Sequence, residues 1–267
     1  MRRFLCSLSL GVGLSACTTE TESICVPAKE TALFGRPNDK TGLSADQCAP
    51  TCGDCEEQWE EEPWTPARVE TLRDWKLETP LGELTVDPYQ SPAAPVEEGA
   101  VCAVLVTDAA LRTYHLETYP SATDAESAGA TVTHGDACGL CSTLQDLAVY
   151  AETLDLTDPV RACGIANLDD HEGLVACIEA LGFSLPCAQV WAYNTEHTRD
   201  VCLDVCLELL GKPYHEENGD LNACLRCDEE ESGAVFKAVA GRTRRNTGIA
   251  SAMCRPCDEV YRLEHAY

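Results

Sequence analysis

Four C-x-x-C pairs are the residues of this 267-residue chain with the clearest capacity for chemistry. They are Cys52/Cys55, Cys138/Cys141, Cys224/Cys227 and Cys254/Cys257. In a reducing compartment such pairs are typical zinc ligands, whereas in an exported protein they are more often part of disulfides. No pair is followed by His, which excludes the motif for covalent c-type haem. The choice between zinc and disulfides therefore depends on where the chain resides.

The first sixteen residues predict export. Arg2 and Arg3 precede an apolar run from Phe4 to Ala16, which is too short for a permanent transmembrane helix. The run ends in Leu14-Ser15-Ala16-Cys17, which resembles the lipobox of bacterial lipoproteins. That resemblance implies cleavage before Cys17, lipidation of its thiol and a place in the bacterial cell envelope. Because Thr18 and not Asp follows Cys17, the resemblance favours the outer membrane.

The net charge of the chain excludes anionic lipid surfaces and nucleic acids as partners of the protein body. Removal of residues 1–16 takes away two arginines and no acid, so the formal net charge falls from −26 to −28. Anionic lipid surfaces and nucleic acids repel such a chain. We therefore expect membrane contact through the lipid anchor only, and no nucleic-acid partner.

Export predicts that the remaining cysteines are oxidised. Cys6 leaves with the signal peptide, and an even count stays in the mature chain besides the lipidated Cys17, which permits eight disulfides and no free thiol. Spacing alone does not fix their connectivity. The disulfide candidates are Cys25, Cys48, Cys52, Cys55, Cys102, Cys138, Cys141, Cys163, Cys177, Cys187, Cys202, Cys206, Cys224, Cys227, Cys254 and Cys257. We expect no bound metal and no cofactor.

Cys138-Gly139-Leu140-Cys141 also allows a redox interpretation. The motif lies between a strand candidate and a helix candidate, and thioredoxin-like oxidoreductases place a C-G-x-C in that position. A helix N-terminus stabilises a thiolate there. The residues that follow predict helices where a thioredoxin fold needs a hairpin, so structural disulfides are the favoured interpretation.

A second candidate site combines a histidine, an aspartate and three arginines. His134 and Asp136 flank a glycine and could act as a base pair or as metal ligands. Arg242, Arg244 and Arg245 form a basic island between two glycines, and arginine forks suit carboxylates and phosphates. These residues could form a hydrolase-type site or bind a small anionic ligand. The favoured alternative is that the histidine lies on the surface and that the arginines pair with acids of the fold.

The elements that must position these residues fall into two kinds. Residues 81–86, 101–106, 111–119 and 130–133 predict short strands, and residues 121–129 predict a short helix. Helix patterns then follow at 142–151, from 157 onward, and at 170–181, 184–193, 198–210, 222–240 and 253–265. We therefore expect an α+β fold, with a small antiparallel sheet followed by a disulfide-rich helical half.

We divide the chain into four parts. Residues 1–16 are the signal peptide, residues 17–65 a lipidated acidic tether, residues 66–134 a small β-containing region and residues 135–267 a cysteine-rich helical domain. The last part resembles uncharacterised cysteine-rich ectodomains of fungi and algae. The resemblance rests on Cys138-Gly139-Leu140-Cys141-Ser142, on Leu225-Arg226-Cys227-Asp228-Glu229 and on residues 236–248. It covers about half of the chain and implies no activity.

These observations favour a binding protein. The chain has no nucleophile elbow, phosphate-binding loop or dinucleotide fingerprint. We expect a membrane-anchored extracytoplasmic lipoprotein whose disulfide-stabilised domain binds a protein partner or a small anionic ligand. An extracytoplasmic enzyme, either a thiol-disulfide oxidoreductase or a hydrolase at the sites above, is the alternative. A purely structural envelope protein is a third possibility.

Overall fold

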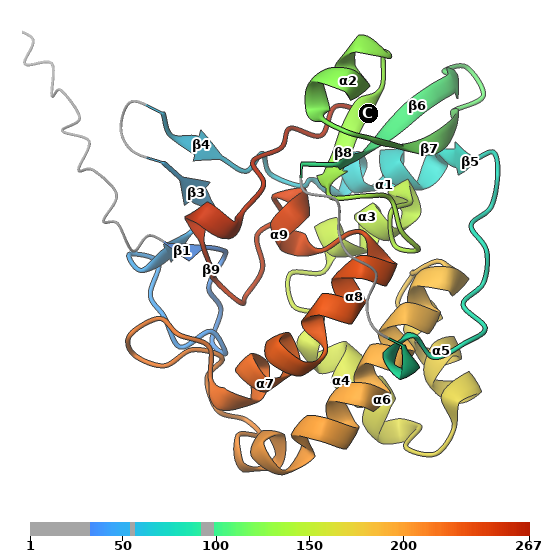
Figure 1. Cartoon of the computed structure of the whole chain (residues 1–267). Coiled ribbons are helices and arrows are strands. Elements are labelled where there is room, and N and C mark those ends of the chain that lie inside the picture. Colours follow the sequence, from blue (N-terminus) through green and yellow to red (C-terminus); the bar gives the residue numbers. More distant parts are fainter. Residues whose placement is uncertain (1–32, 54–56, 92–98) are drawn as a thin grey trace, which may run out of the picture.

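A computed structural model describes residues 33–53, 57–91 and 99–267 (Figure 1). It confirms the α+β fold, with small sheets packed against a disulfide-rich set of helices. The predicted signal peptide and Cys17, Cys25 and Cys55 lie outside the described residues. Within the described ranges, no helix combines the length and apolar character needed to cross a bilayer.

The largest sheet is built on the strands predicted at 101–106 and 111–119, which pair as an antiparallel hairpin. Its strand order is β5-β7-β6-β8, with β6 antiparallel to both of its neighbours and β5 joined in parallel at one edge. The Asp108 carboxylate accepts from the backbone N–H groups of Ala110 and Leu111 and so fixes the hairpin turn. The strands are β5 (Lys76–Leu77), β6 (Val101–Asp108), β7 (Thr113–Tyr119) and β8 (Thr131–Gly135).

The predicted strand at 81–86 is absent from the structure. This segment has no regular secondary structure and crosses the longest helix, where the backbone N–H of Leu84 donates to the side chain of Gln189 at 2.8 Å. The short helix η1 (Pro88–Gln90) follows it. Packing against the helix therefore outweighs the local strand pattern.

Helices make up most of the remaining chain. Side-chain caps at Thr65, Ser121, Thr143, Asp170 and Asn222 begin five of them, as the preference for short polar residues at this position requires. The helices are α1 (Pro66–Asp74), α2 (Ala122–Ser127), α3 (Leu144–Glu152), α4 (Thr157–Ala166), α5 (His171–Glu179), α6 (Leu185–Glu208), α7 (Ala223–Glu231), α8 (Gly233–Ala240) and α9 (Arg244–Thr247).

Three helix predictions were wrong in their boundaries. The predicted helices 184–193 and 198–210 are the single helix α6, because polar residues between them bond to neighbours and do not end the helix. Thr195 donates to the Trp191 carbonyl at 2.8 Å, and Thr198 donates to Asp228 at 2.5 Å. Conversely, the predicted helix 222–240 divides at the fully buried Ser232 into α7 and α8.

The first described residues and a segment near the C-terminus form a small sheet together. β1 (Leu33–Phe34) pairs with β2 (Cys48–Ala49) and with β9 (Arg255–Pro256), while β3 (Thr51–Cys52) pairs with β4 (Trp59–Glu60). The helix predicted at 253–265 is therefore wrong: β9, the short helix η2 (Cys257–Glu259) and irregular chain take its place. Residues 33–53 and 57–65 of the predicted tether pack against this C-terminal segment instead of extending away from the body (Figure 1).

Fourteen described cysteines form seven disulfides, which confirms the cysteine-rich, disulfide-bonded character of the chain. Every bond joins partners at least 14 positions apart, and no C-x-x-C pair is bonded internally among the described residues. The pairs are Cys48–Cys254, Cys52–Cys257, Cys102–Cys138, Cys141–Cys187, Cys163–Cys177, Cys202–Cys227 and Cys206–Cys224.

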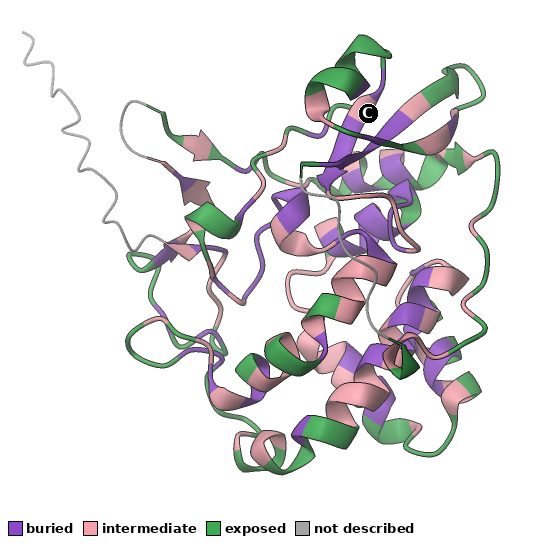
Figure 2. Ribbon diagram, viewed as in Figure 1, coloured by how far each residue is buried: buried purple, intermediate pink, exposed green. Residues whose placement is uncertain are grey.

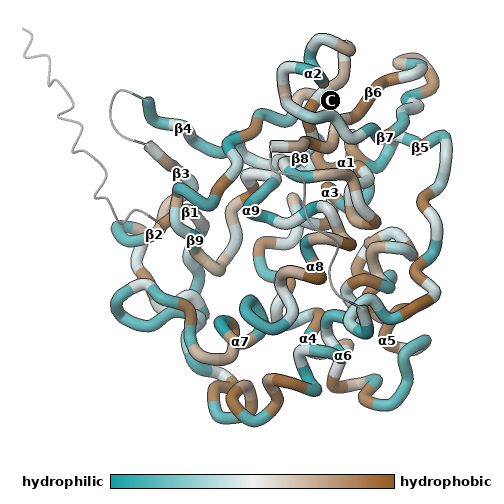
Figure 3. The backbone as a smooth tube through the Cα atoms, viewed as in Figure 1, coloured by the Kyte–Doolittle hydropathy of each residue, from teal (hydrophilic) through white to brown (hydrophobic). Residues whose placement is uncertain are grey.

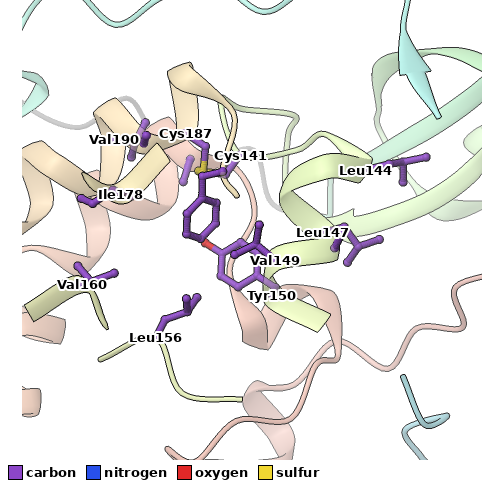
Figure 4. Close-up of a cluster of buried hydrophobic side chains, with 14 of the residues drawn as sticks. Cys141, Leu144, Leu147, Val149, Tyr150, Leu156, Val160, Ile178, Cys187 and Val190 are labelled. Carbon is purple, nitrogen blue, oxygen red and sulfur yellow. A yellow bond between two sulfur atoms is a disulfide. The ribbon is translucent and has the colours of Figure 1, made fainter. Parts of the chain in front are cut away.

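The main core lies between the large sheet and α1, α3, α5 and α6. Leu144, Leu147 and Ile178 are fully buried there, and the Cys141–Cys187 disulfide crosses the same cluster (Figure 4). Figure 2 shows buried residues concentrated along α3 and the sheet, whereas α7 and the second half of α6 carry many exposed positions. The second half of α6 is therefore the part of the helical layer that the core does not use.

Candidate functional site

His134 is a buried structural residue and not a surface or catalytic one. Its side chain is fully buried at the end of β8, 2.6 Å from the Gly135 carbonyl through Nδ1 and 2.7 Å from Ser142 Oγ through Nε2. Because a carbonyl only accepts, Nδ1 carries the proton and Nε2 accepts from Ser142. Burial and the nearby Arg242 charge lower the pKa of His134 well below its ordinary value, so the ring is neutral. No substrate reaches this imidazole.

Arg242 is also fully buried, and it holds together three segments of backbone. Its guanidinium donates to the carbonyls of Thr133, Cys141 and Ser142 at 2.9–3.0 Å and to the Thr133 hydroxyl at 2.8 Å. Burial lowers its pKa. The partners of this arginine are therefore mainly carbonyls and not the acids that the sequence suggested.

The other predicted site residues are engaged as well. Arg244 donates to the carbonyls of Tyr150 and Ala250, and burial lowers its pKa to about 10. Arg245 bonds to Glu229 and Glu259 at 2.5 and 2.8 Å. Asp136 pairs with Lys237 at 3.0 Å. The structure therefore does not assemble these residues with His134 into an open anion or hydrolase site, and that part of the sequence interpretation was wrong.

The redox interpretation of Cys138 and Cys141 was wrong too. Cys138 is bonded to Cys102 on β6, and Cys141 is bonded to Cys187 on α6. The intervening Gly139 lies against Gly241, where an added Cβ would come within 2.5 Å of the Gly241 nitrogen. The motif thus locks two loops together. The same bonding removes the thiolates that zinc would need at Cys138, Cys141, Cys224, Cys227, Cys254 and Cys257.

The structure contains instead an apolar groove of about 530 Å³ that the sequence interpretation missed. One face of α6 forms its floor, from Trp191 through Thr195 and Thr198 to Leu207. This spacing is that of one helix face. At 1.5 Å per residue the floor is about 24 Å long between Trp191 and Leu207. The volume lies within the ~300–1,000 Å³ of ordinary small-molecule sites.

Two helical walls flank the floor. On one side α4 contributes Val160, Gly164 and Ile165, and on the other side α7 and α8 contribute Leu225 and Phe236. Gly164 allows the close approach of α4 to α6, since a Cβ there would lie 2.8 Å from the Thr195 methyl group. The groove is therefore a property of three packed helices and not of one segment.

The open part of the groove is lined by large exposed apolar side chains. They are between 46% and 61% exposed, far above the value for a core residue, and they are Ile165, Leu168, Leu203, Leu207 and Leu210. Figure 3 shows hydrophobic backbone segments at this end of the molecule, near α4 and α6. A contiguous exposed apolar patch marks a binding surface more often than an accidental one.

The closed end of the groove is aromatic. Trp191 packs edge-on against Phe236 with ring centroids 4.8 Å apart, and Tyr150 lies 6.4 Å from Trp191. The Arg244 guanidinium lies over the Tyr150 ring, 5.4 Å from its centroid. Burial raises the pKa of the Tyr150 hydroxyl, so this end of the groove stays uncharged apart from Arg244.

Cations outnumber acids along the groove, although the whole chain carries a net charge of −26. Three lining residues are acidic, Asp155, Asp228 and Glu229, and burial raises the pKa of Asp228. The six lining cations are Arg161, Arg199, Lys237, Arg244, Arg245 and Arg255. The groove is therefore a locally basic, apolar site on an acidic protein.

One sequence signal could have indicated this site. Leu203, Leu207 and Leu210 recur at helical spacing, but so do core residues. Only the packing of α4, α7 and α8 shows that these leucines border an opening.

Comparison with known proteins gives one partial match. Residues 171–263 match a family of unknown function, DUF8771, over the segment from α5 to η2. This segment contains the groove floor and the α7–α8 wall, and it contains both disulfides that fix α6 to α7, Cys202–Cys227 and Cys206–Cys224. No curated protein matches the chain, and no solved structure matches it.

Proposed function

We propose that the protein is an extracytoplasmic, lipid-anchored binding protein whose groove takes a single-chain amphiphile with an apolar chain and an anionic head. The observation that carries the proposal is the row of exposed leucines and isoleucine along a groove of about 530 Å³. The locally basic lining supports an anionic head group. The disulfides around α6 and α7 support a groove that is formed before the ligand arrives.

The groove is tested by titration calorimetry with laurate below its micelle concentration. We expect a saturable 1:1 isotherm for the folded protein. Leu207→Glu puts a carboxylate on the groove floor and should weaken binding at least 10-fold. Leu111→Glu is the matched control, because Leu111 is also largely exposed, 68% against 55% for Leu207, but lies at the hairpin turn, and it should leave binding unchanged. Equal binding by both variants would contradict a site in the groove.

An amphipathic helix of a protein partner is the other occupant with this geometry, since such helices lie in apolar grooves. A helix of this kind would present acidic residues beside its apolar face. Two results together would favour that occupant and overturn the small-amphiphile proposal. The first is the absence of any binding of laurate, and the second is a cross-link between an envelope protein and the groove surface around Leu207.

The lipid anchor is proposed from the sequence alone. Lipidation of Cys17 and a place in the bacterial outer membrane follow from the lipobox resemblance. Labelling with radioactive palmitate should mark the wild-type chain, and Cys17→Ala should lose both the label and sedimentation with membranes. Retention of the label in Cys17→Ala would contradict the anchor without affecting the proposal for the groove.

A further inference from the structure

We infer that Arg199 is the residue that binds the anionic head of the ligand, and that the ligand carries a carboxylate or phosphate monoester on an unbranched chain. This inference rests on the proposed function, because it assigns the polar end of the same groove. It follows from a comparison of the cations that line the groove, most of which the fold already compensates.

Five of these six cations have close protein partners. Arg161 pairs with Asp158 at 3.2 Å, and Lys237 pairs with Asp136 at 3.0 Å. Arg245 and Arg255 share Glu229, each at 2.5 Å, and Arg244 donates to backbone carbonyls. A ligand that bound to any of them would have to displace an existing partner.

Arg199 differs from the others. Its closest carboxylate contact is 3.9 Å, from Nε to Asp200, and the Asp200 side chain is 74% exposed. That pair is therefore weak. Among the described residues, Nη1 is buried without a hydrogen-bond partner, although a buried guanidinium nitrogen ordinarily donates to an acceptor. The fold thus leaves on this residue both a nearly uncompensated charge and an unsatisfied donor.

The position of Arg199 fits a head-group anchor. It lies on α6 one turn after Thr195 and one turn before Leu203, so it is at the middle of the groove floor and beside the exposed leucines. Its side chain is about a quarter exposed, so an anion reaches the guanidinium from the groove opening. A planar fork binds carboxylate or phosphate through two parallel hydrogen bonds. The apolar chain then lies along the leucines or toward Trp191 and Phe236.

The test compares four probes that share a twelve-carbon chain: laurate, dodecyl phosphate, dodecanol and dodecyltrimethylammonium. Calorimetry at pH 7.5 is performed with the wild type, Arg199→Gln, Arg199→Lys and Arg73→Gln. The last variant is the matched control, because Arg73 is a partly exposed arginine on α1 that does not line the groove and is paired with Glu70 at 3.5 Å. Circular dichroism and the melting temperature verify that each variant is folded.

We expect Arg199→Gln to weaken the binding of laurate and dodecyl phosphate about 10- to 100-fold, as the loss of a charge-assisted hydrogen bond predicts. The affinity for dodecanol should stay unchanged. Arg199→Lys should restore part of the affinity, because it keeps the charge and loses the fork. Arg73→Gln should change each affinity less than threefold. The ratio of laurate to dodecyl phosphate affinity in the wild type identifies the head group.

Three results would overturn the inference, and only one of them also overturns the proposed function. If the wild type binds dodecanol as tightly as laurate and Arg199→Gln changes neither, the groove binds apolar chains but Arg199 is not the anchor. If no probe binds to the wild type, the proposed function fails together with the inference. Preferential binding of dodecyltrimethylammonium would also overturn the inference, because it reverses the sign of the head group.

Discussion

The guanidinium of Arg242 donates to both the carbonyl oxygen and the hydroxyl of Thr133, at 3.0 and 2.8 Å. The two residues join the connection between α8 and α9 to the middle of β8. The same guanidinium holds the carbonyls of Cys141 and Ser142 just before α3. One buried side chain therefore satisfies backbone acceptors from two segments that lie 100 to 109 positions away in the sequence.

The first prediction concerns this arginine. Arg242→Met should lower the free energy of unfolding by about 3–5 kcal/mol, because it leaves buried carbonyls without donors. Urea titration followed by circular dichroism measures the change. Arg262→Met, at an exposed arginine, is the control and should stay within about 0.5 kcal/mol of the wild type. A loss below 1 kcal/mol for Arg242→Met would show that other donors replace the guanidinium.

The second prediction concerns two neighbouring disulfides. Cys48–Cys254 and Cys52–Cys257 span 206 and 205 positions, but each closes only a short loop while the other is intact. Replacing one pair by alanines should therefore cost about 2.5 kcal/mol, and replacing both about 7 kcal/mol. The joint cost exceeds twice the single cost because only the double variant releases the long loop. Additive costs in urea titrations would contradict this coupling.

The third prediction concerns the glycine of the C-G-x-C segment. Gly139→Ala should destabilise the protein by at least ~2 kcal/mol, because its Cβ would lie 2.5 Å from the Gly241 nitrogen and the Val239 carbonyl oxygen. Gly82→Ala is the matched control, because an added Cβ there meets nothing within 4 Å. A melting temperature of Gly139→Ala equal to that of Gly82→Ala would show that the two loops separate at little cost.

The fourth prediction concerns pH. Burial lowers the pKa of His134, His215 and His265, and that of His265 falls to about 3. An unfolded histidine has a pKa near 6.5, so between about pH 6.5 and 5 the unfolded chain takes up protons that the folded chain does not. Stability should therefore be full above pH 6.5 and fall as the pH decreases, by at most ~1.4 kcal/mol per pH unit for each histidine.

The raised pKa values of Glu61, Asp146 and Asp228 act in the opposite sense, because the folded state binds those protons first. Urea titrations at pH 7.5, 6.5, 5.5 and 5.0 measure the net slope. His265→Gln should reduce the number of protons taken up on unfolding by about one, and the slope falls in proportion. The reason is that the folded His265 stays neutral across this window, because its pKa is about 3. The Arg262→Met control should keep the wild-type slope. Equal slopes for His265→Gln and the wild type would contradict a neutral buried His265.

The residues of the candidate site could not be predicted from the sequence. It singled out His134 and Arg242 for their chemistry, and the structure uses both as buried hydrogen-bonding groups. It gave no prominence to Arg199, which neighbours exposed leucines and has the least compensated charge in the groove. Charge compensation depends on which acids the fold brings within a few ångströms, and residue spacing does not contain that information.

The sequence by itself determined the features that local chemistry controls. Alternating residues and the Asp108 turn specify the hairpin of β6 and β7, and short polar caps mark the helix starts, because these preferences act over a few residues. The tertiary structure alone decided which cysteines pair, why 253–265 is not a helix and where the groove opens. These features depend on segments up to 206 positions apart, which meet only when the chain buries its apolar surface.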